Sequence, residues 1–170
     1  MQREVDEDFA RYVRARQHAL LRAAYLVCGD AHLAEDLLQQ AFTKVARRWD
    51  RLRHENPDAY IRRILYRDAI SAWRRTRRES LVTALPDRAA VDPSSAVADR
   101  VDIERALAAL TPRQRAVLVL RFFEDRSEAD TAEVLGVGVG TVKSQTHAAL
   151  ARLRDRIPGL VPSPTGGTQP

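Results

Sequence analysis

The polar side chains with the clearest chemical use lie late in the chain, between Ser127 and Leu153. Apolar residues recur there at helical spacing and predict two short helices, with these residues facing inward: Ala129, Ala132, Leu135, Val139, Val142, Ala149, Leu150 and Leu153. Five polar residues of the second helix are then left largely outward, next to Gly140: Thr141, Lys143, Ser144, Gln145 and His147. Their hydroxyl, amine, amide and imidazole groups are suited to hydrogen bonds with base edges and phosphates.

The connection between these two helices has the residues of a tight turn. Ser127 is a good N-cap for the first helix, and Asp130 is placed to return the hydrogen bond of a capping box. Gly136 falls where a helix ends in a left-handed residue, and Gly138 or its neighbour can begin the second helix. The pattern is typical both of a DNA-binding helix-turn-helix and of an ordinary helical hairpin, and periodicity alone does not decide between them.

A second group of chemically useful residues lies on a predicted helix from Asp58 to about Arg78, which Asn56 would cap and Pro57 would begin. Basic and aromatic side chains interleave along it: Tyr60, Arg62, Arg63, Tyr66, Arg67, Trp73, Arg74, Arg75, Arg77 and Arg78. Arginine can bind phosphate, and aromatic rings can stack on unpaired bases. Considered as a basic helix alone, however, the segment favours a solvated arginine face with half-buried rings over nucleic-acid binding.

The remaining pattern predicts an all-α protein of two small helical domains joined by a flexible linker. Helices are expected over Phe9–Cys28, from Asp30 as N-cap to about Leu52, over Asp99–Leu110, and from Thr111 as N-cap onward, where Ala116, Val117, Leu120 and Phe123 face the core. The segment from Glu79 to Arg100 has weak periodicity and two prolines. The predicted division is residues 1–78, a linker at 79–99, a second domain at 100–157 and a disordered tail at 158–170.

Composition narrows the functional classes. The formal net charge of +5 favours a polyanionic partner such as nucleic acid. Cys28 is the only cysteine, the four histidines are scattered, and no glycine-rich phosphate loop or metal-ligand spacing is present, so no metal, cofactor or enzymatic activity is expected. The N-terminus does not resemble a secretory signal, and no apolar run is long enough for a membrane span, so a cytoplasmic protein is expected.

Three segments, in this order and spacing, resemble the extracytoplasmic-function (ECF) group of bacterial RNA polymerase sigma factors. They are AEDLLQQAFTKVARRW from Ala34, DAYIRRILYRDAISAWRR from Asp58, and the stretch from Leu110 to Arg154 that contains GTVKS at Gly140. The resemblance covers about Phe9 to Arg156, and the GTVKSQT variant suggests an actinobacterial, SigE-like subgroup.

The resemblance implies a promoter-specificity subunit with a region 2-like domain and a region 4-like helix-turn-helix domain. It implies binding to the largest and second-largest subunits of core RNA polymerase through Glu35, Asp36, Leu37, Gln40 and Phe42. It places the melted −10 promoter element on Tyr60, Arg63, Arg67, Asp68, Trp73 and Arg74, and the −35 element on Gly140, Thr141, Lys143, Ser144, Gln145 and His147. An anti-sigma partner is common in the family.

Departures from the family pattern affect what is expected of the DNA contacts. Asp68 stands where asparagine is common, and an ionised carboxylate cannot donate hydrogen bonds. Gln145, Ala148 and Leu150 stand where arginines are frequent, which predicts fewer phosphate contacts. A stand-alone helix-turn-helix regulator is the competing hypothesis, but it leaves the aromatic and basic helix without a role.

Overall fold

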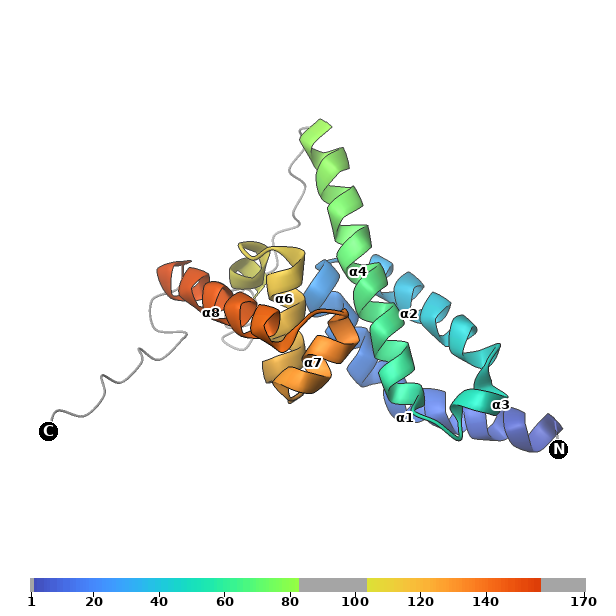
Figure 1. The fold of residues 1–170 in the computed structure, drawn as a ribbon. Helices are drawn as coiled ribbons and strands as arrows, with labels where there is room; N and C mark the ends of the chain where they lie inside the picture. Colours follow the sequence, from blue (N-terminus) through green and yellow to red (C-terminus); the bar gives the residue numbers. More distant parts are fainter. Residues whose placement is uncertain (1, 83–103, 157–170) are drawn as a thin grey trace, which may run out of the picture.

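The computed structural model describes residues 2–82 and 104–156, and the regular secondary structure of these residues is all helical, as predicted. Residues 104–108 form a short helical segment. The labelled elements are α1 (Gln2–Cys28), α2 (Ala31–Ala46), α3 (Trp49–Leu52), α4 (Pro57–Val82), α6 (Pro112–Leu118), the π-helix η1 (Val119–Phe123), α7 (Glu128–Leu135) and α8 (Val139–Arg156) (Figure 1). None of the described helices could span a membrane.

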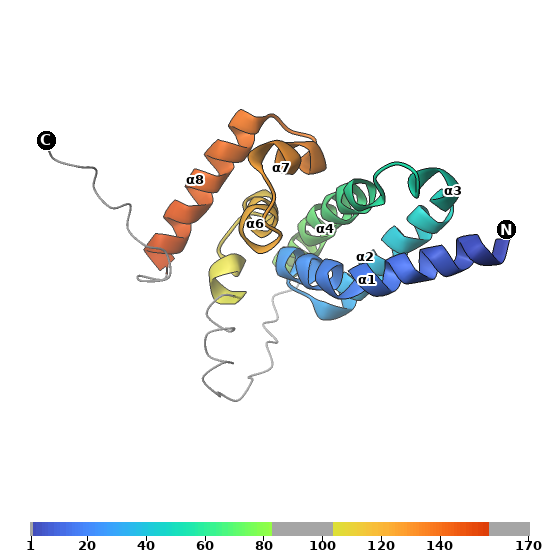
Figure 2. The ribbon, with the colours of Figure 1, turned by 90° about the horizontal axis from the view of Figure 1, so that it is seen from below.

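The first half of the chain is built from α1, α2 and α4, which pack against one another around a common core (Figures 1 and 2). The predicted caps are confirmed: Asp30 accepts a hydrogen bond from the Leu33 N–H at 2.7 Å, and Asn56 accepts one from the Ala59 N–H at 3.0 Å. Each cap satisfies a backbone donor that the first turn of a helix would otherwise leave unpaired. The predicted inward face of α4 is also buried: Ile61, Ile64, Leu65, Ala69 and Ala72.

The prediction of one helix from Asp30 to about Leu52 was wrong. The helix ends at Ala46, and a short separate helix, α3, follows after Arg47 and Arg48. Arg48 leaves the helical region at φ −127° and ψ 13°. The break lets Trp49 and Leu52 enter the core, where they are 5% and 2% exposed, because an unbroken helix would point them in another direction.

The second half contains the predicted helix-turn-helix. Ser127 caps α7 by accepting from the Asp130 N–H at 3.0 Å, and Gly136 ends that helix in the left-handed region at φ 64°. The capping box differs from the prediction, because the Asp130 carboxylate accepts from the Ser127 hydroxyl instead of the Ser127 N–H. Two residues expected to face inward, Ala129 and Val139, are exposed.

The helix that begins after the Thr111 cap changes from an α-helix to a π-helix before it ends. Thr111 and Gln114 form a reciprocal capping box, and α6 continues to Leu118, where the wider π-helix η1 begins. The wider turn is closed by a hydrogen bond from the Glu124 N–H to the Val119 carbonyl at 2.9 Å. One extra residue in the turn rotates the following side chains, so Phe123, expected in the core, is 40% exposed.

The two halves lie against each other, with α7 and α6 against α4, and with α6 and η1 against α1 (Figures 1 and 2). Their apolar residues merge, because Ala116, Val119, Leu120 and Val134 belong to the same core cluster as the residues of α1, α2 and α4. The helix α4 continues to Val82, beyond the end predicted at Arg78. Most of the predicted linker and all of the predicted tail lie outside the described residues.

Candidate nucleic-acid interface

The helix α8 presents the polar surface that the sequence predicted. Thr141, Lys143, Ser144 and His147 are exposed, and Gln145 is half-buried. The buried residues Val142, Ala149 and Leu153 hold the opposite side of α8 against α6 and α7. This arrangement leaves hydrogen-bonding groups on the outside of a rigid helix, which is what reading base edges in a major groove requires.

The helix α4 carries a second polar surface, and neighbouring helices fix its first turn. Asp58 accepts a hydrogen bond from the Tyr12 hydroxyl at 3.0 Å and forms an ion pair with Arg16 at 2.9 Å. Tyr60, half-buried, accepts a hydrogen bond from Arg48 at 3.0 Å, and the Arg48 guanidinium also lies 5.8 Å from the centre of the Tyr60 ring. The start of the candidate −10 surface is therefore anchored to both α1 and the α2–α3 connection.

Asp68 does not lie free on the α4 surface. One carboxylate oxygen accepts from Lys44 of α2 at 2.8 Å, and the other accepts from Arg67 at 3.2 Å. Partial burial alone would raise the pKa of Asp68, but the hydrogen bonds and charges of Lys44 and Arg67 outweigh it and hold the pKa below its usual value. Asp68 is thus an ionised acceptor that orients two basic side chains.

The remaining predicted residues of α4 differ in their surroundings. Arg74 is exposed, and Arg63 is exposed but forms an ion pair with Glu133 of α7 at 3.0 Å. Trp73 is half-buried, with the Arg115 guanidinium 5.8 Å from its ring centre. Two of the candidate −10 residues, Arg63 and Trp73, are therefore engaged by side chains from the second half of the chain.

The predicted polymerase-binding residues divide into surface and core. Glu35, Asp36 and Gln40 are exposed on α2, and Phe42 is half-buried. Leu37 is 5% exposed and packs in the core, so it supports this surface from beneath and is not part of it. The exposed polar patch lies on consecutive turns of one helix, since Gln40 follows Asp36 by four positions and Glu35 by five.

Sequence reasoning missed the polar cluster that joins the two halves. Arg62 and Tyr66 of α4 both donate hydrogen bonds to the carboxylate of Glu124, which directly follows η1. The Arg62 and Glu124 side chains are each only 8% exposed, and Tyr66 is 1% exposed. The i, i+4 spacing of Arg62 and Tyr66 was visible in the sequence, but nothing marked Glu124 as their partner.

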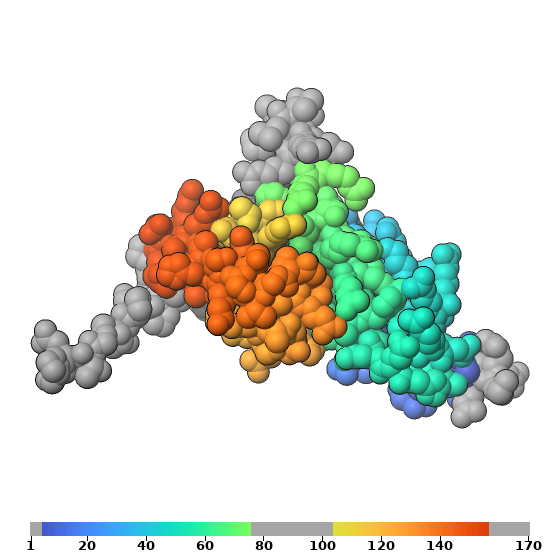
Figure 3. Space-filling model, in the orientation of Figure 1, coloured from blue at the N-terminus to red at the C-terminus, as the bar shows by residue number. Residues whose placement is uncertain are grey.

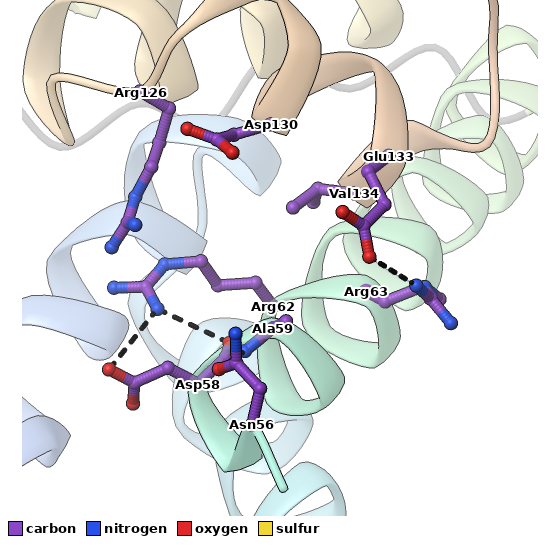
Figure 4. A pocket seen from close by; sticks show the side chains of 9 residues that line it. All are labelled: Asn56, Asp58, Ala59, Arg62, Arg63, Arg126, Asp130, Glu133 and Val134. Atoms are coloured by element: carbon purple, nitrogen blue, oxygen red, sulfur yellow. Dashed lines mark hydrogen bonds and ion pairs between the residues drawn. The ribbon is translucent and has the colours of Figure 1, made fainter.

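This cluster borders a small cavity of about 80 Å³ between α4 and α7. Figure 4 shows Arg62 and Arg63 reaching from α4 toward residues of the other half, with Arg63 paired to Glu133, and Arg126 and Asp130 on the far side. In the space-filling view the atoms of α7 lie directly against those of α4 (Figure 3). Arginine and acidic side chains make up most of the cavity lining, and its volume suits one or a few water molecules rather than a substrate.

Comparisons with known proteins agree with this geometry. Residues 12–79 match the family model described as Sigma-70 region 2, and residues 100–153 match the one described as Sigma-70, region 4. The first match contains most of α4 and the exposed patch of α2, and the second contains α6, α7 and most of α8.

Whole relatives resemble the chain over most of its length. The RNA polymerase sigma-E factor of Streptomyces avermitilis is 42% identical over 152 residues, which cover 88% of this chain and 85% of that protein. The ECF RNA polymerase sigma factor SigM of Mycobacterium tuberculosis is 30% identical over 146 residues, covering 85% and 74% respectively. The sigma factor RpoE from Bartonella quintana, solved in complex with the anti-sigma factor NepR, superposes with a TM-score of 0.72 at 27% identity over 88% of this chain and 96% of that one. The chain belongs to the ECF, SigE-like group of RNA polymerase sigma factors, the subunits that direct promoter-specific initiation of transcription.

Proposed function

We propose that this sigma factor divides promoter recognition between residues 1–78 and 100–157. The exposed face of α2, with Glu35, Asp36 and Gln40, binds core polymerase. The surface of α4 holds the unpaired nontemplate strand of the −10 element, and α8 reads the −35 duplex. The observation that carries this proposal is the set of outward polar groups on α8, which follows a left-handed Gly136 turn as a recognition helix does.

The energy for strand opening comes from binding and needs no catalytic group. An unpaired base stacked on an aromatic side chain contributes about 1–3 kcal/mol, and Tyr60 and Trp73 are half-buried rings on the proposed path. Arg67 and Arg74 supply charge for the phosphates between them. The protein therefore acts by binding alone, without catalysis of its own. Its place of action in this proposal is the cytoplasm, where the promoter DNA and core polymerase are.

Asp68 has an indirect role in this proposal. An asparagine could donate to an extruded base, whereas the ionised Asp68 accepts from Lys44 and Arg67. We assign to Asp68 the role of positioning the Arg67 side chain to bind the nontemplate strand. Selection of the extruded base is then made by other residues of the α4 surface.

An anti-sigma factor is the further partner that we propose. The RpoE relative was solved with one, and the surfaces that such a protein would need to cover, α4 and α8, are polar and face outward in part. Co-purification of the tagged chain with a single small partner that suppresses transcription is the expected sign of such regulation.

The test is transcription by a reconstituted holoenzyme, with the 5′ ends of its transcripts sequenced. Lys143→Ala is expected to weaken initiation and to lower the salt dependence of promoter binding by about 0.9 in the log-log slope, because one phosphate contact is lost. Gln145→Ala is expected to relax the preference at one −35 base pair, and Arg156→Ala, an exposed change at the end of α8, serves as the control. Failure of the wild-type chain to form a complex with core polymerase in gel filtration contradicts the proposal.

A further inference from the structure

Arg48 places a positive charge beside the first turn of α4. Its guanidinium donates a hydrogen bond to the Tyr60 hydroxyl at 3.0 Å, and the residue is exposed. Within the described residues no carboxylate pairs with Arg48, whereas the exposed Arg63 of α4 is paired with Glu133. Because an arginine has five N–H donors and Arg48 uses one of them on Tyr60, it keeps its charge and most of its donors for a ligand.

The local backbone holds Arg48 in this position. Helix α2 ends at Ala46, and Arg48 lies outside the helical region, at φ −127° and ψ 13°, before α3 begins. The Arg48 carbonyl accepts from the Leu52 N–H at 3.0 Å, and the next residue, Trp49, is buried against Phe9 with ring centres 5.2 Å apart. A continuous helix through this position would point the guanidinium in another direction. The break in the helix therefore directs Arg48 toward α4.

Tyr60 is held from the opposite side. The residue is half-buried and packs against the core of the first half, and its N–H donates to the Asn56 carbonyl at 3.2 Å. The Arg48 guanidinium lies 5.8 Å from the ring centre and grips the hydroxyl, at the edge of the ring. Part of the ring surface is therefore left accessible in a fixed orientation, and such a ring is a platform on which an unpaired base can stack.

A second contact between the end of α2 and α4 extends this arrangement. Lys44 lies four residues before Arg48, and its amine donates to the Asp68 carboxylate at 2.8 Å. Asp68 is about two helical turns after Tyr60 on α4. Between these two contacts, the exposed Arg67 lies seven positions after Tyr60 and so on the same side of α4. A strand on this side of α4 would follow a border of positive side chains, with the Tyr60 ring at one end.

We propose that Arg48 and Tyr60 form a subsite for one nucleotide of an unpaired strand, with the base stacked on the Tyr60 ring and the phosphate bound by the remaining N–H groups of Arg48. This inference rests on the role proposed above for α4, and it adds to that surface a residue outside α4. A guanidinium suits both tasks, because its donors lie in one plane in a rigid fork, whereas a lysine amine acts as a point charge. A phosphate contact carries no sequence information, so the subsite fixes the position of the strand without selecting a base.

Binding of a single-stranded oligonucleotide to the reconstituted holoenzyme tests the subsite. The probe is the −10 nontemplate strand of the promoter located by transcript sequencing, carries a fluorophore, and is titrated at several salt concentrations. Arg48→Met is expected to weaken binding about fivefold and to reduce the log-log salt slope by about 0.7, the value for one phosphate contact on a single strand. Arg51→Met, an exposed change in α3 with the same loss of charge, should alter neither quantity.

Two further variants separate the positioning of the ring from the charge. Tyr60→Phe keeps the ring but removes the acceptor of the Arg48 hydrogen bond, so the affinity should fall about threefold while the salt slope stays at the wild-type value. Arg48→Lys should also keep the slope and lose part of the affinity, because the charge remains but the fork of donors does not. If the Arg48 contact served folding alone, Arg48→Met would lower the melting temperature and leave the salt slope unchanged.

Neutral methylphosphonate linkages, placed one at a time along the probe, locate the phosphate. One linkage is expected to weaken binding to the wild-type holoenzyme about fivefold and to have no effect on the Arg48→Met holoenzyme, which has already lost that contact. An unchanged salt slope in Arg48→Met, or the same response of both proteins to every linkage, would overturn the subsite. Wild-type holoenzyme that does not bind the strand would refute the proposed role of α4 and the subsite with it. Wild-type binding that Arg48→Met leaves unchanged would refute the subsite alone.

Discussion

Asp68 shows how one substitution changes the use of a helix surface. Its carboxylate is paired with Lys44 and Arg67, and that pairing holds its pKa low. A lowered pKa means that the folded chain binds the proton less readily than the unfolded chain. The stabilising contribution is therefore present above the unfolded pKa of about 4 and disappears as the pH falls through the lower, folded value.

We expect Asp68→Asn to lower the free energy of unfolding by about 0.5–1 kcal/mol at pH 7, the scale of a pair that is open to solvent on one side. Urea denaturation at pH 7 and near pH 3 measures the free energy of unfolding of both proteins. The difference in this free energy between the wild type and the variant should be smaller at the lower pH. A difference that is the same at both pH values would mean that the introduced amide is unfavourable for reasons of shape and not of charge.

Tyr66 leads to a prediction at the opposite end of the pH scale. Burial raises the pKa of its hydroxyl well above the usual value, and the charge of Glu124 raises it further. The folded chain keeps the proton while the unfolded chain loses it near pH 10. The contribution of the Tyr66 hydroxyl to the free energy of unfolding is therefore fully present below pH 10. Above pH 10 it falls by about 1.4 kcal/mol per pH unit until the pKa of the folded chain is reached.

Tyr66→Phe should remove this alkaline decline while lowering stability at pH 7 by about 1.5–3 kcal/mol, because a hydrogen bond to a charged group is lost. Denaturant titrations at pH 8 and pH 11 compare the two proteins. An equal alkaline decline in the variant would assign that decline to other tyrosines, such as Tyr12, whose pKa burial and Asp58 also raise.

At the scale of the element, the turn of the helix-turn-helix depends on one backbone conformation. Gly136 has φ 64°, and a Cβ there would meet no atom within 4 Å. Gly136→Ala is therefore expected to cost about 1–2 kcal/mol through backbone strain alone. Gly140→Ala, in an equally open position inside α8 with no positive φ, is the matched control and should stabilise by up to about 1 kcal/mol. Equal melting temperatures for the two variants would contradict the strain argument.

Helix starts were predictable because their signals are local. Asp30, Asn56, Thr111 and Ser127 each satisfy a backbone donor only a few residues away, so the sequence alone was sufficient to find them. Periodicity likewise predicted the buried face of α4.

The errors occurred where distant parts of the chain decide the structure. The break after Ala46 exists because Trp49 reaches Phe9 and Tyr12 of α1, with ring centres 5.2 and 4.9 Å away. The burial of Glu124 depends on a π-turn and on partners about sixty positions earlier. The surfaces of α4 and α8 were recognised from residue types, whereas the contacts between the two halves needed the packed arrangement.

At the scale of the whole molecule, the shared core predicts cooperative unfolding. Residues of α6, η1 and α7 belong to the same apolar cluster as α1, α2 and α4, and Arg115 donates to the Val27 carbonyl between them. Gly29 permits this close approach, because a Cβ there would lie 3.2 Å from the Arg115 guanidinium. Two halves coupled in this way should melt together, although each matches a separate family model.

Calorimetry of the isolated full-length chain should show a single transition whose calorimetric and van't Hoff enthalpies agree. Arg115→Met keeps an apolar stem in place but leaves the Val27 carbonyl without this donor, at a cost of about 1–3 kcal/mol. The shared apolar cluster is kept, so the variant should still melt in one transition, at a lower temperature than the wild type. Arg113→Met, an exposed change on the same helix, should leave the melting temperature unchanged. Two transitions in the wild-type chain would mean that the halves are held together too weakly to unfold as one, and the coupling through the shared core would then be refuted.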